Sequence, residues 1–269
     1  MTVSWTIGPN WSNVHKITTM KKITLLLALS CFAFLSSCGD DDPKAPGVNF
    51  DITFKATFDG VQLEKNKDVQ FGSIPLFVEA CRMYLSDITL LSGDKEFQIS
   101  EIEYLDFTPS NATFATPTIT FKNVLEGEYT GIRFGYGVKP TLNAKTPSNF
   151  PAGHPLSIET DYWSGWDSYI FSTLDGKADP ENNGTKNLSL AYHCGSDPVY
   201  KTFEFDQAIH VHEGQAGARV TFDMKKFLTL ADGSLYDIVA NPATSNSASN
   251  VTVAQILTAN FGRATTVEQ

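Results

Sequence analysis

The stretch from residue 48 to residue 58 alternates strictly between apolar and polar side chains, and this pattern limits the fold more than any other. Its apolar members are Val48, Phe50, Ile52, Phe54, Ala56 and Phe58. A period of two places every second side chain on the same face, so the stretch predicts a β-strand with one face buried and one face in water. Asp59 and Gly60 follow it and are typical of a tight turn.

Similar β-rich runs recur along the chain and are separated by turn residues. They cover residues 81–91, 101–107, 118–124, 129–136, 168–174, 188–192, 202–212 and 218–224. Helical patterns are confined to 225–231 and 252–261, and the second places Val253, Ile256, Leu257 and Phe261 on one face. Because no helices alternate with the strands, a parallel α/β sheet is excluded. We predict an all-β fold, an antiparallel β-sandwich with long loops and a short C-terminal helix.

The N-terminus indicates a segment that is removed on export. Two lysines follow Met20, then come the apolar run 23–35 and small residues before Cys38. A run of this length is too short to span about 30 Å of hydrocarbon and is typical of a secretory signal peptide. Residues 1–19 precede the signal and are interpreted as an over-extended start, so residues 1–37 are expected to be missing from the exported protein.

Residues Leu35 to Cys38 resemble the lipobox of bacterial lipoproteins, in which the cysteine becomes an acylated first residue. Cys38 is therefore the predicted lipid anchor, and membrane contact is expected through it alone. The alternative is an ordinary cleaved signal with a coincidental cysteine. Residues 38–47 form an acidic tether whose start resembles the sorting signal of surface lipoproteins in Bacteroidetes-type cells. We expect a location in the cell envelope (outer membrane, periplasm or surface) and a single domain over 48–269.

Composition and motifs argue against several functions. Thirty acidic against twenty basic residues give a formal net charge of -10, which excludes a nucleic-acid partner because phosphate binding needs clustered Lys and Arg. The chain contains neither G-x-S-x-G, nor H-E-x-x-H, nor G-x-x-x-x-G-K-[ST], nor G-x-G-x-x-G. Hydrolase, zinc-protease and nucleotide-binding functions therefore lack support, and we expect a protein that is not an enzyme.

The candidate ligands crowd into residues 154–212. Beyond the predicted signal peptide the chain has two tryptophans and four histidines: Trp163, Trp166, His154, His193, His210 and His212. A tryptophan is usually a core residue and a lone histidine is usually structural, but imidazole is also the commonest metal ligand. His210 and His212 lie on the polar face of a predicted strand, about 6.5–7 Å apart, where they either chelate one ion or are simply solvated. The long aperiodic segment 141–161 is typical of functional loops.

Two further groups have open interpretations. Cys81 and Cys194 form a disulfide, remain as two buried free thiols, or leave Cys194 as a soft ligand. Adjacent strand residues point to opposite faces, so His193 and Cys194 are not expected to bind one ion together. The oxygen-rich loop 175–183 is a possible calcium site, but it lacks the EF-hand spacing and is more often just a turn.

Most of the chain resembles the MbnP-like copper-binding proteins. The similarity rests on the order and spacing of six segments: MYLSDITLLSGD at 83–94, IRFGYGVKPTLN at 132–143, HPLS at 154–157, YWSGWDSYIF at 162–171, LDG at 174–176 and AYHCGSD at 191–197. The resemblance implies an all-β fold, an envelope or surface location and a mononuclear copper site. His154 and His193 match the histidine segments of the family. The chain departs from it where Gly165 displaces the second tryptophan to 166, and where Cys194 takes a usually apolar place.

In this family a tryptophan can be converted to kynurenine by a partner di-haem enzyme, and Trp163 is the best match to that position. The resemblance thus predicts a non-enzymatic, lipid-anchored protein that captures or stores copper with His154, His193 and Trp163, with His210 and His212 as second choice. Two imidazoles with a weak third donor favour Cu(I) over Cu(II). The rival prediction is a glycan-binding protein whose exposed, coplanar Trp163 and Trp166 stack on sugars. A surface protein without a ligand is a third alternative.

Overall fold

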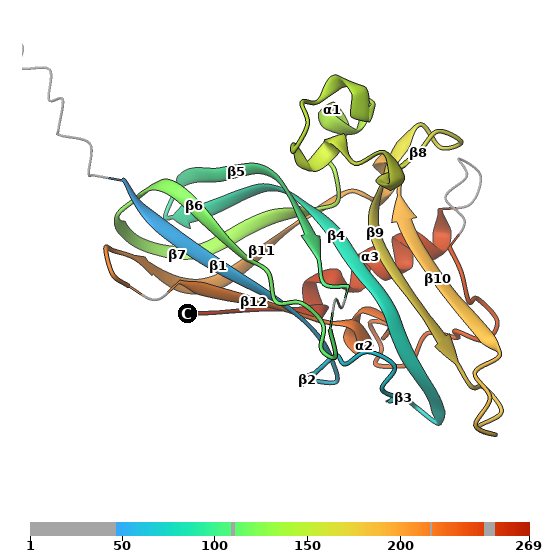
Figure 1. The fold of residues 1–269 in the computed structure, drawn as a ribbon. Coiled ribbons are helices and arrows are strands. Elements are labelled where there is room, and N and C mark those ends of the chain that lie inside the picture. Colours follow the sequence, from blue (N-terminus) through green and yellow to red (C-terminus); the bar gives the residue numbers. More distant parts are fainter. Residues whose placement is uncertain (1–46, 109–110, 216, 245–250) are drawn as a thin grey trace, which may run out of the picture. The chain divides into compact units, whose positions relative to one another are not determined.

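The computed structural model describes residues 47–108, 111–215, 217–244 and 251–269, which belong to one compact unit. The predicted signal peptide, the predicted anchor Cys38 and all but the last residue of the predicted tether lie outside these residues. Two β-sheets make up most of the described chain, so the all-β prediction is confirmed (Figure 1). No helix among the described residues is long and apolar enough to cross a membrane.

The smaller sheet is built around β1 (Gly47–Phe58). One edge of β1 pairs with β12 (Ala218–Asp223), which in turn pairs with β13 (Thr265–Glu268). The other edge pairs with β6 (Thr118–Leu125) and with β2 (Val61–Gln62). β1 and β12 run parallel, which is a departure from the purely antiparallel pairing that the sequence predicts.

The larger sheet has the strand order β10-β9-β4-β7-β11. Its members are β10 (Leu188–Gly195), β9 (Ser168–Ala178), β4 (Ile74–Ser92), β7 (Gly127–Tyr136) and β11 (Lys201–Val211). Three further strands attach to this order: β3 (Val69–Phe71) and β5 (Lys95–Asp106) pair with β4, and β8 (Tyr162–Trp163) pairs with β9. β10, which carries His193, and β11, which carries His210 and ends one residue before His212, therefore lie at opposite ends of this strand order.

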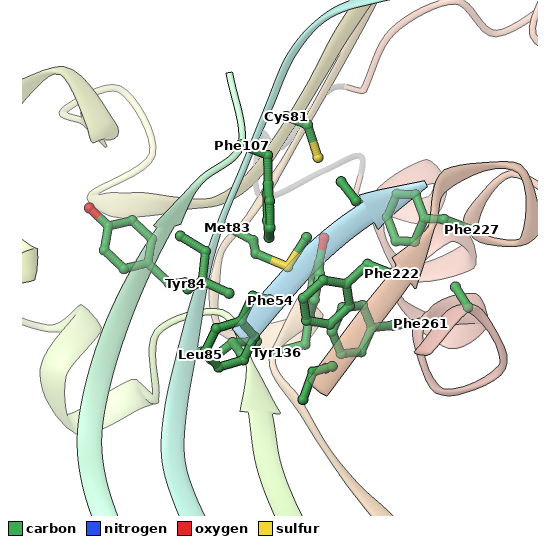
Figure 2. Packing of buried hydrophobic residues seen from close by; sticks show 14 of the residues in the cluster. Phe54, Cys81, Met83, Tyr84, Leu85, Phe107, Tyr136, Phe222, Phe227 and Phe261 are labelled. Carbon is green, nitrogen blue, oxygen red and sulfur yellow. The ribbon is translucent and has the colours of Figure 1, made fainter. Parts of the chain in front are cut away.

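The core lies between the two sheets, as the alternation in β1 predicts. Phe50, Ile52, Phe54, Ala56 and Phe58 are all buried. Figure 2 shows the centre of this core, where rings from β1, β12 and α3 (Thr252–Ala264) meet the side chains of β4. Burying aromatic rings from both sheets against one helix stabilises the pairing of the sheets, because each ring removes a large apolar area from water.

The helices are few and mostly short. α3 confirms the predicted C-terminal helix, and Leu257 and Phe261 are buried as expected, whereas Val253 and Ile256 are only half-buried. α2 (Met224–Phe227) overlaps the predicted helical stretch 225–231. The predicted loop 141–161 contains no strand and consists of short turns: α1 (Pro140–Asn143), η1 (Pro147–Asn149), η2 (Pro155–Ser157) and η3 (Glu159–Asp161). A fourth 3₁₀ turn, η4 (Asp197–Val199), follows β10.

Cys81 and Cys194 are both buried and free, so the disulfide alternative is not realised in the structure. Cys81 on β4 lies opposite Leu174 of β9, and Cys194 on β10 lies opposite Ser172 of the same strand. The two cysteines are thus separated by an intervening strand, about 9–10 Å in the direction of the hydrogen bonds. A disulfide requires Cα atoms within about 7 Å, and the sheet keeps these two further apart.

Candidate functional site

His193 forms a side-chain pair with Asp175 across β10 and β9. Its Nε2 lies 2.8 Å from Oδ1 of Asp175. His193 is opposite Thr173, and Asp175 is opposite Ala191, so the two side chains are diagonal neighbours on one face of the sheet. Both side chains are about one-third accessible, at 31% and 28%. The pair is therefore partly shielded from water yet open to a small ligand.

The backbone of His193 forms two hydrogen bonds with the side chain of Thr244. Its N–H donates to the hydroxyl of Thr244 at 2.8 Å, and that hydroxyl donates to its carbonyl at 2.7 Å. In the neutral ring, the carboxylate of Asp175 accepts from Nε2–H, which directs the lone pair to Nδ1. An imidazole whose second nitrogen donates to a carboxylate is the usual arrangement of metal-binding histidines.

Trp163 and Trp166 form a parallel stack beside this pair. Their ring centroids are 4.9 Å apart and their planes differ by 9°. The six-membered ring of Trp166 lies 3.4 Å from the position that a Cβ on Gly195 would occupy. Gly195 follows His193 by two residues on β10, and the pairing of β10 with β9 shifts register between Cys194 and Gly195. Trp166, rather than the predicted Trp163, is the indole next to β10, and Trp163 forms the outer layer with 48% of its surface exposed.

His154 is held within its own segment. Its Nδ1 accepts a hydrogen bond of 3.1 Å from the backbone N–H of Leu156, which makes His154 the N-cap of η2. Its ring also stacks on Phe150 at a centroid distance of 4.5 Å. The ammonium of Lys145 lies 5.7 Å from the centroid of the Phe150 ring. Within the described residues, no three His, Cys, Asp or Glu side chains are arranged to hold a metal. To bind a metal, His154 would have to give up the hydrogen bond that it accepts from the backbone N–H of Leu156.

The segment 139–161, which carries His154, is anchored on the sheet beside β8 and β9 (Figure 1). The hydroxyl of Tyr84 donates to the carbonyl of Pro155 at 3.1 Å, and that of Tyr169 donates to the carbonyl of Leu156 at 2.8 Å. At the end of the segment, the carboxylate of Asp161 is buried 3.8 Å from the guanidinium of Arg82. Burial, and then the charge of Asp161, raise the pKa of Tyr84.

These anchors were not predicted. A tyrosine in an alternating run and an aspartate after a 3₁₀ turn carry no sequence signal of their mutual contact. A further anchor of the segment is Asn143, the last residue of α1. Its side-chain oxygen accepts the backbone N–H of Tyr169 at 2.9 Å and ties α1 to the beginning of β9.

His210 and His212 form a separate group with Glu128. Nε2 of His212 lies 2.8 Å from Oε1 of Glu128, and Nδ1 of His210 contacts the other carboxylate oxygen. The hydrogen bonds from His212 and then His210 hold the pKa of Glu128 below its ordinary value. His210 in β11 and His212 directly after the strand are both exposed, as the alternation predicts. Four strand spacings, about 19 Å, separate β11 from β10, so this group does not belong to the His193 site.

The possible calcium loop has internal partners for its carboxylates. Asp175 is the partner of His193, and Asp179 accepts the backbone N–H groups of Asn183 and Gly184 at 3.1 and 2.6 Å. These bonds close a turn after β9. Glu181, the third carboxylate of the loop, accepts a hydrogen bond of 2.8 Å from the side-chain amide of Asn183.

Three comparisons with known proteins bear on the family. The MbnP family model matches residues 48–250, well over half of the chain. Among solved structures, MbnP from Methylosinus trichosporium is similar, with a TM-score of 0.48 and 16% sequence identity over 66% of this chain and 76% of that chain. No match was found among curated proteins. On the extent of the family match, the chain belongs to the MbnP family.

Proposed function

We propose that this protein binds copper in the cell envelope and captures or stores it without catalysing a reaction. Copper is the cargo, and Cys38 is the proposed lipid anchor that keeps the protein at a membrane. Membership of the MbnP family supports the class of function. The observation that carries the proposal is the His193–Asp175 pair beside the stacked indoles, because a carboxylate-oriented imidazole is preorganised for a metal.

The proposed donors follow from the arrangement of the site. His193, oriented by Asp175, is the first imidazole. His154 is the second imidazole, and giving up the bond from Leu156 costs about 1 kcal/mol. A weak third contact comes from the indole pair: Trp163, or the kynurenine that a partner di-haem enzyme would make from it, is the donor that the family resemblance implies, and Trp166 is the indole nearer β10. Two imidazoles and one weak donor suit Cu(I), which accepts low coordination numbers.

A titration with Cu(I) under anaerobic conditions tests this assignment. We expect His193→Ala to weaken binding at least tenfold relative to the unmodified protein. His212→Ala is the matched control, because it removes an imidazole that also pairs with a carboxylate but lies on the opposite edge of the sheet. Equal affinity in His193→Ala and the unmodified protein would contradict the proposed site, and a loss confined to His212→Ala would assign copper to the second-choice pair.

Glycan binding remains a second candidate because Trp163 is half-exposed. The two indoles are stacked face to face rather than laid side by side, so one indole face is offered instead of a coplanar pair. The glycan proposal predicts that soluble polysaccharides change the tryptophan fluorescence and that Trp163→Ala removes this change. Copper binding with no response to glycans would decide against it.

A further inference from the structure

Three sulfur-bearing residues line one cavity in the core. Cys81 and Met83 lie on β4, and Met224 begins α2. The Sγ atom of Cys81 is 3.7 Å from the Sδ atom of Met224, and all three residues line a cavity of about 10 Å³. This volume corresponds to roughly one water molecule. Figure 2 shows Cys81 and Met83 on the same side of β4, facing the rings of the core.

The cavity offers soft donors in apolar surroundings. Phe222, Phe227 and Tyr136 line it together with the three sulfur-bearing residues, and Arg82, which lies between Cys81 and Met83 on β4, also belongs to the lining. Cys81 and Met83 are two apart in a strand and therefore share a face, while Met224 approaches from the other sheet through the turn after β12. Thiolate and thioether ligands select soft ions such as Cu(I), whereas divalent hard ions prefer oxygen.

We propose that this cavity is a second metal site, which takes a single soft monovalent cation, Cu(I) or Ag(I), through the sulfur atoms of Cys81, Met83 and Met224. Metal–sulfur bonds of about 2.3 Å in a trigonal arrangement place two sulfur atoms about 4 Å apart. The separation of 3.7 Å between Cys81 and Met224 needs little adjustment to reach that geometry. The site is independent of the proposed histidine site and does not depend on it.

Charge selects a monovalent ion. When the ion binds, the Cys81 thiol loses its proton to solvent and a sulfur–metal bond forms in its place, so one positive charge replaces another. A thiolate with Cu(I) or Ag(I) is neutral overall, whereas a divalent ion would leave a net positive charge in an apolar core. Burial raises the pKa of Cys81 to about 12, so the metal-free site holds a neutral thiol.

Burial also sets how the ion reaches the site. Cys81, Met83 and Met224 are all buried, so uptake requires local opening. α2 has only four residues and contributes one of the three sulfur atoms, which makes it the smallest element that opening has to displace. Uptake by the folded protein should therefore be slow, and refolding in the presence of the ion should load the site quickly.

Metal stoichiometry tests the site in a background where Cys31→Ser and Cys38→Ser leave Cys81 and Cys194 as the only thiols. The probes are Ag(I) and anaerobic Cu(I), each added during refolding, with bound metal counted by native mass spectrometry. Besides any ion at the proposed histidine site, we expect one ion that is lost in Cys81→Ala and retained in Cys194→Ala, the matched control for a buried thiol outside the cavity. Binding of this ion should release one proton and give a thiolate-to-metal absorption band.

Met224→Leu keeps the volume of the side chain and removes only the sulfur, so it serves if Cys81→Ala does not fold. We expect it to weaken binding at least tenfold. Unchanged stoichiometry in Cys81→Ala, or unchanged affinity in Met224→Leu, would overturn the proposal. His193→Ala should leave this ion in place, so failure of the histidine site and failure of the sulfur site are distinguishable.

Discussion

Nε2 of His193 and Oδ1 of Asp175 lie 2.8 Å apart because the two residues occupy diagonal positions on neighbouring antiparallel strands. The register of β9 and β10 therefore fixes the orientation of the imidazole. The hydroxyl of Thr244 holds the His193 backbone from the open edge of β10. This relationship makes Asp175 a positioning residue for His193 in the proposed copper site.

Asp175→Asn should weaken copper binding by about 10- to 100-fold without unfolding the protein. Asparagine can still accept the Nε2–H, but it lacks the charge that makes the imidazole a better donor. Competition with a chelator measures the affinity. Glu128→Gln is the matched control, since it changes the carboxylate of the other histidine group in the same way. An equal loss in both variants would point to a general effect of acidic charge instead of positioning.

Trp166 lies near Gly195 of β10 and stacks on Trp163. This arrangement predicts which indole responds to a ligand at His193. Trp166 lies against β10, so copper should quench its fluorescence more than that of Trp163. Quenching should persist in Trp163→Phe and fall in Trp166→Phe. The opposite order would favour Trp163 as the contact residue, as the family resemblance implies.

Intact mass tests the proposed conversion of Trp163. Kynurenine formation removes one carbon atom and adds one oxygen atom, and the exposure of Trp163 leaves its ring accessible to an oxidising partner. Protein isolated from its native cells should carry this mass increase, and Trp163→Phe should lack it. An increase that persists in Trp163→Phe would assign the modification to another residue.

Cys81 and Cys194 should be unreactive in the folded protein. Burial raises the pKa of Cys81 to about 12 and that of Cys194 to about 11, so almost no thiolate exists at neutral pH. Alkylation at pH 8 should label neither residue until denaturant is added, and both should then react without reductant. Labelling that requires prior reduction would instead reveal a disulfide.

The carboxylate of Glu128 should give the fold a pH-dependent contribution. Its hydrogen bonds to His212 and His210 lower its pKa, so its contribution to stability is present above the ordinary value of 4.5. The contribution should disappear as the pH falls through the lowered pKa. The stability difference between the unmodified protein and Glu128→Gln, from denaturant unfolding, should therefore shrink with acidification. A difference that grows as the pH falls would show that the carboxylate is unfavourable in the folded state.

The local patterns in the sequence predicted the parts of the fold that depend on period. β1, the exposed face of β11 and the helix at the C-terminus follow from alternation and from helical spacing, because burial on one face leaves that trace. Pairing between strands that are distant in the sequence leaves no such periodic pattern. The parallel contact of β1 with β12 and the separation of Cys81 from Cys194 depend on strand order, which no local pattern encodes.

The candidate site shows the same division. His193 was identified from the sequence, but its partner Asp175 was assigned to a possible calcium loop, since the diagonal contact exists only in the register of β9 with β10. Glu128 has no sequence signal for the same reason, because it lies opposite His210 on the neighbouring strand β7. Trp166 was ranked below Trp163 although it is the indole that contacts β10.

Phe261 of α3 should be among the residues most important for stability. Its ring is 5.4 Å from that of Phe222 in the small sheet and 4.6 Å from that of Tyr136 in the large sheet, so it joins both layers. Phe261→Ala should lower the free energy of unfolding by about 3–5 kcal/mol, because it removes buried apolar area and leaves a cavity. Ile256→Ala on the same helix is the control and should cost less, since Ile256 is only half-buried. Equal losses would mean that α3 stabilises the fold by helix formation alone rather than by joining the sheets.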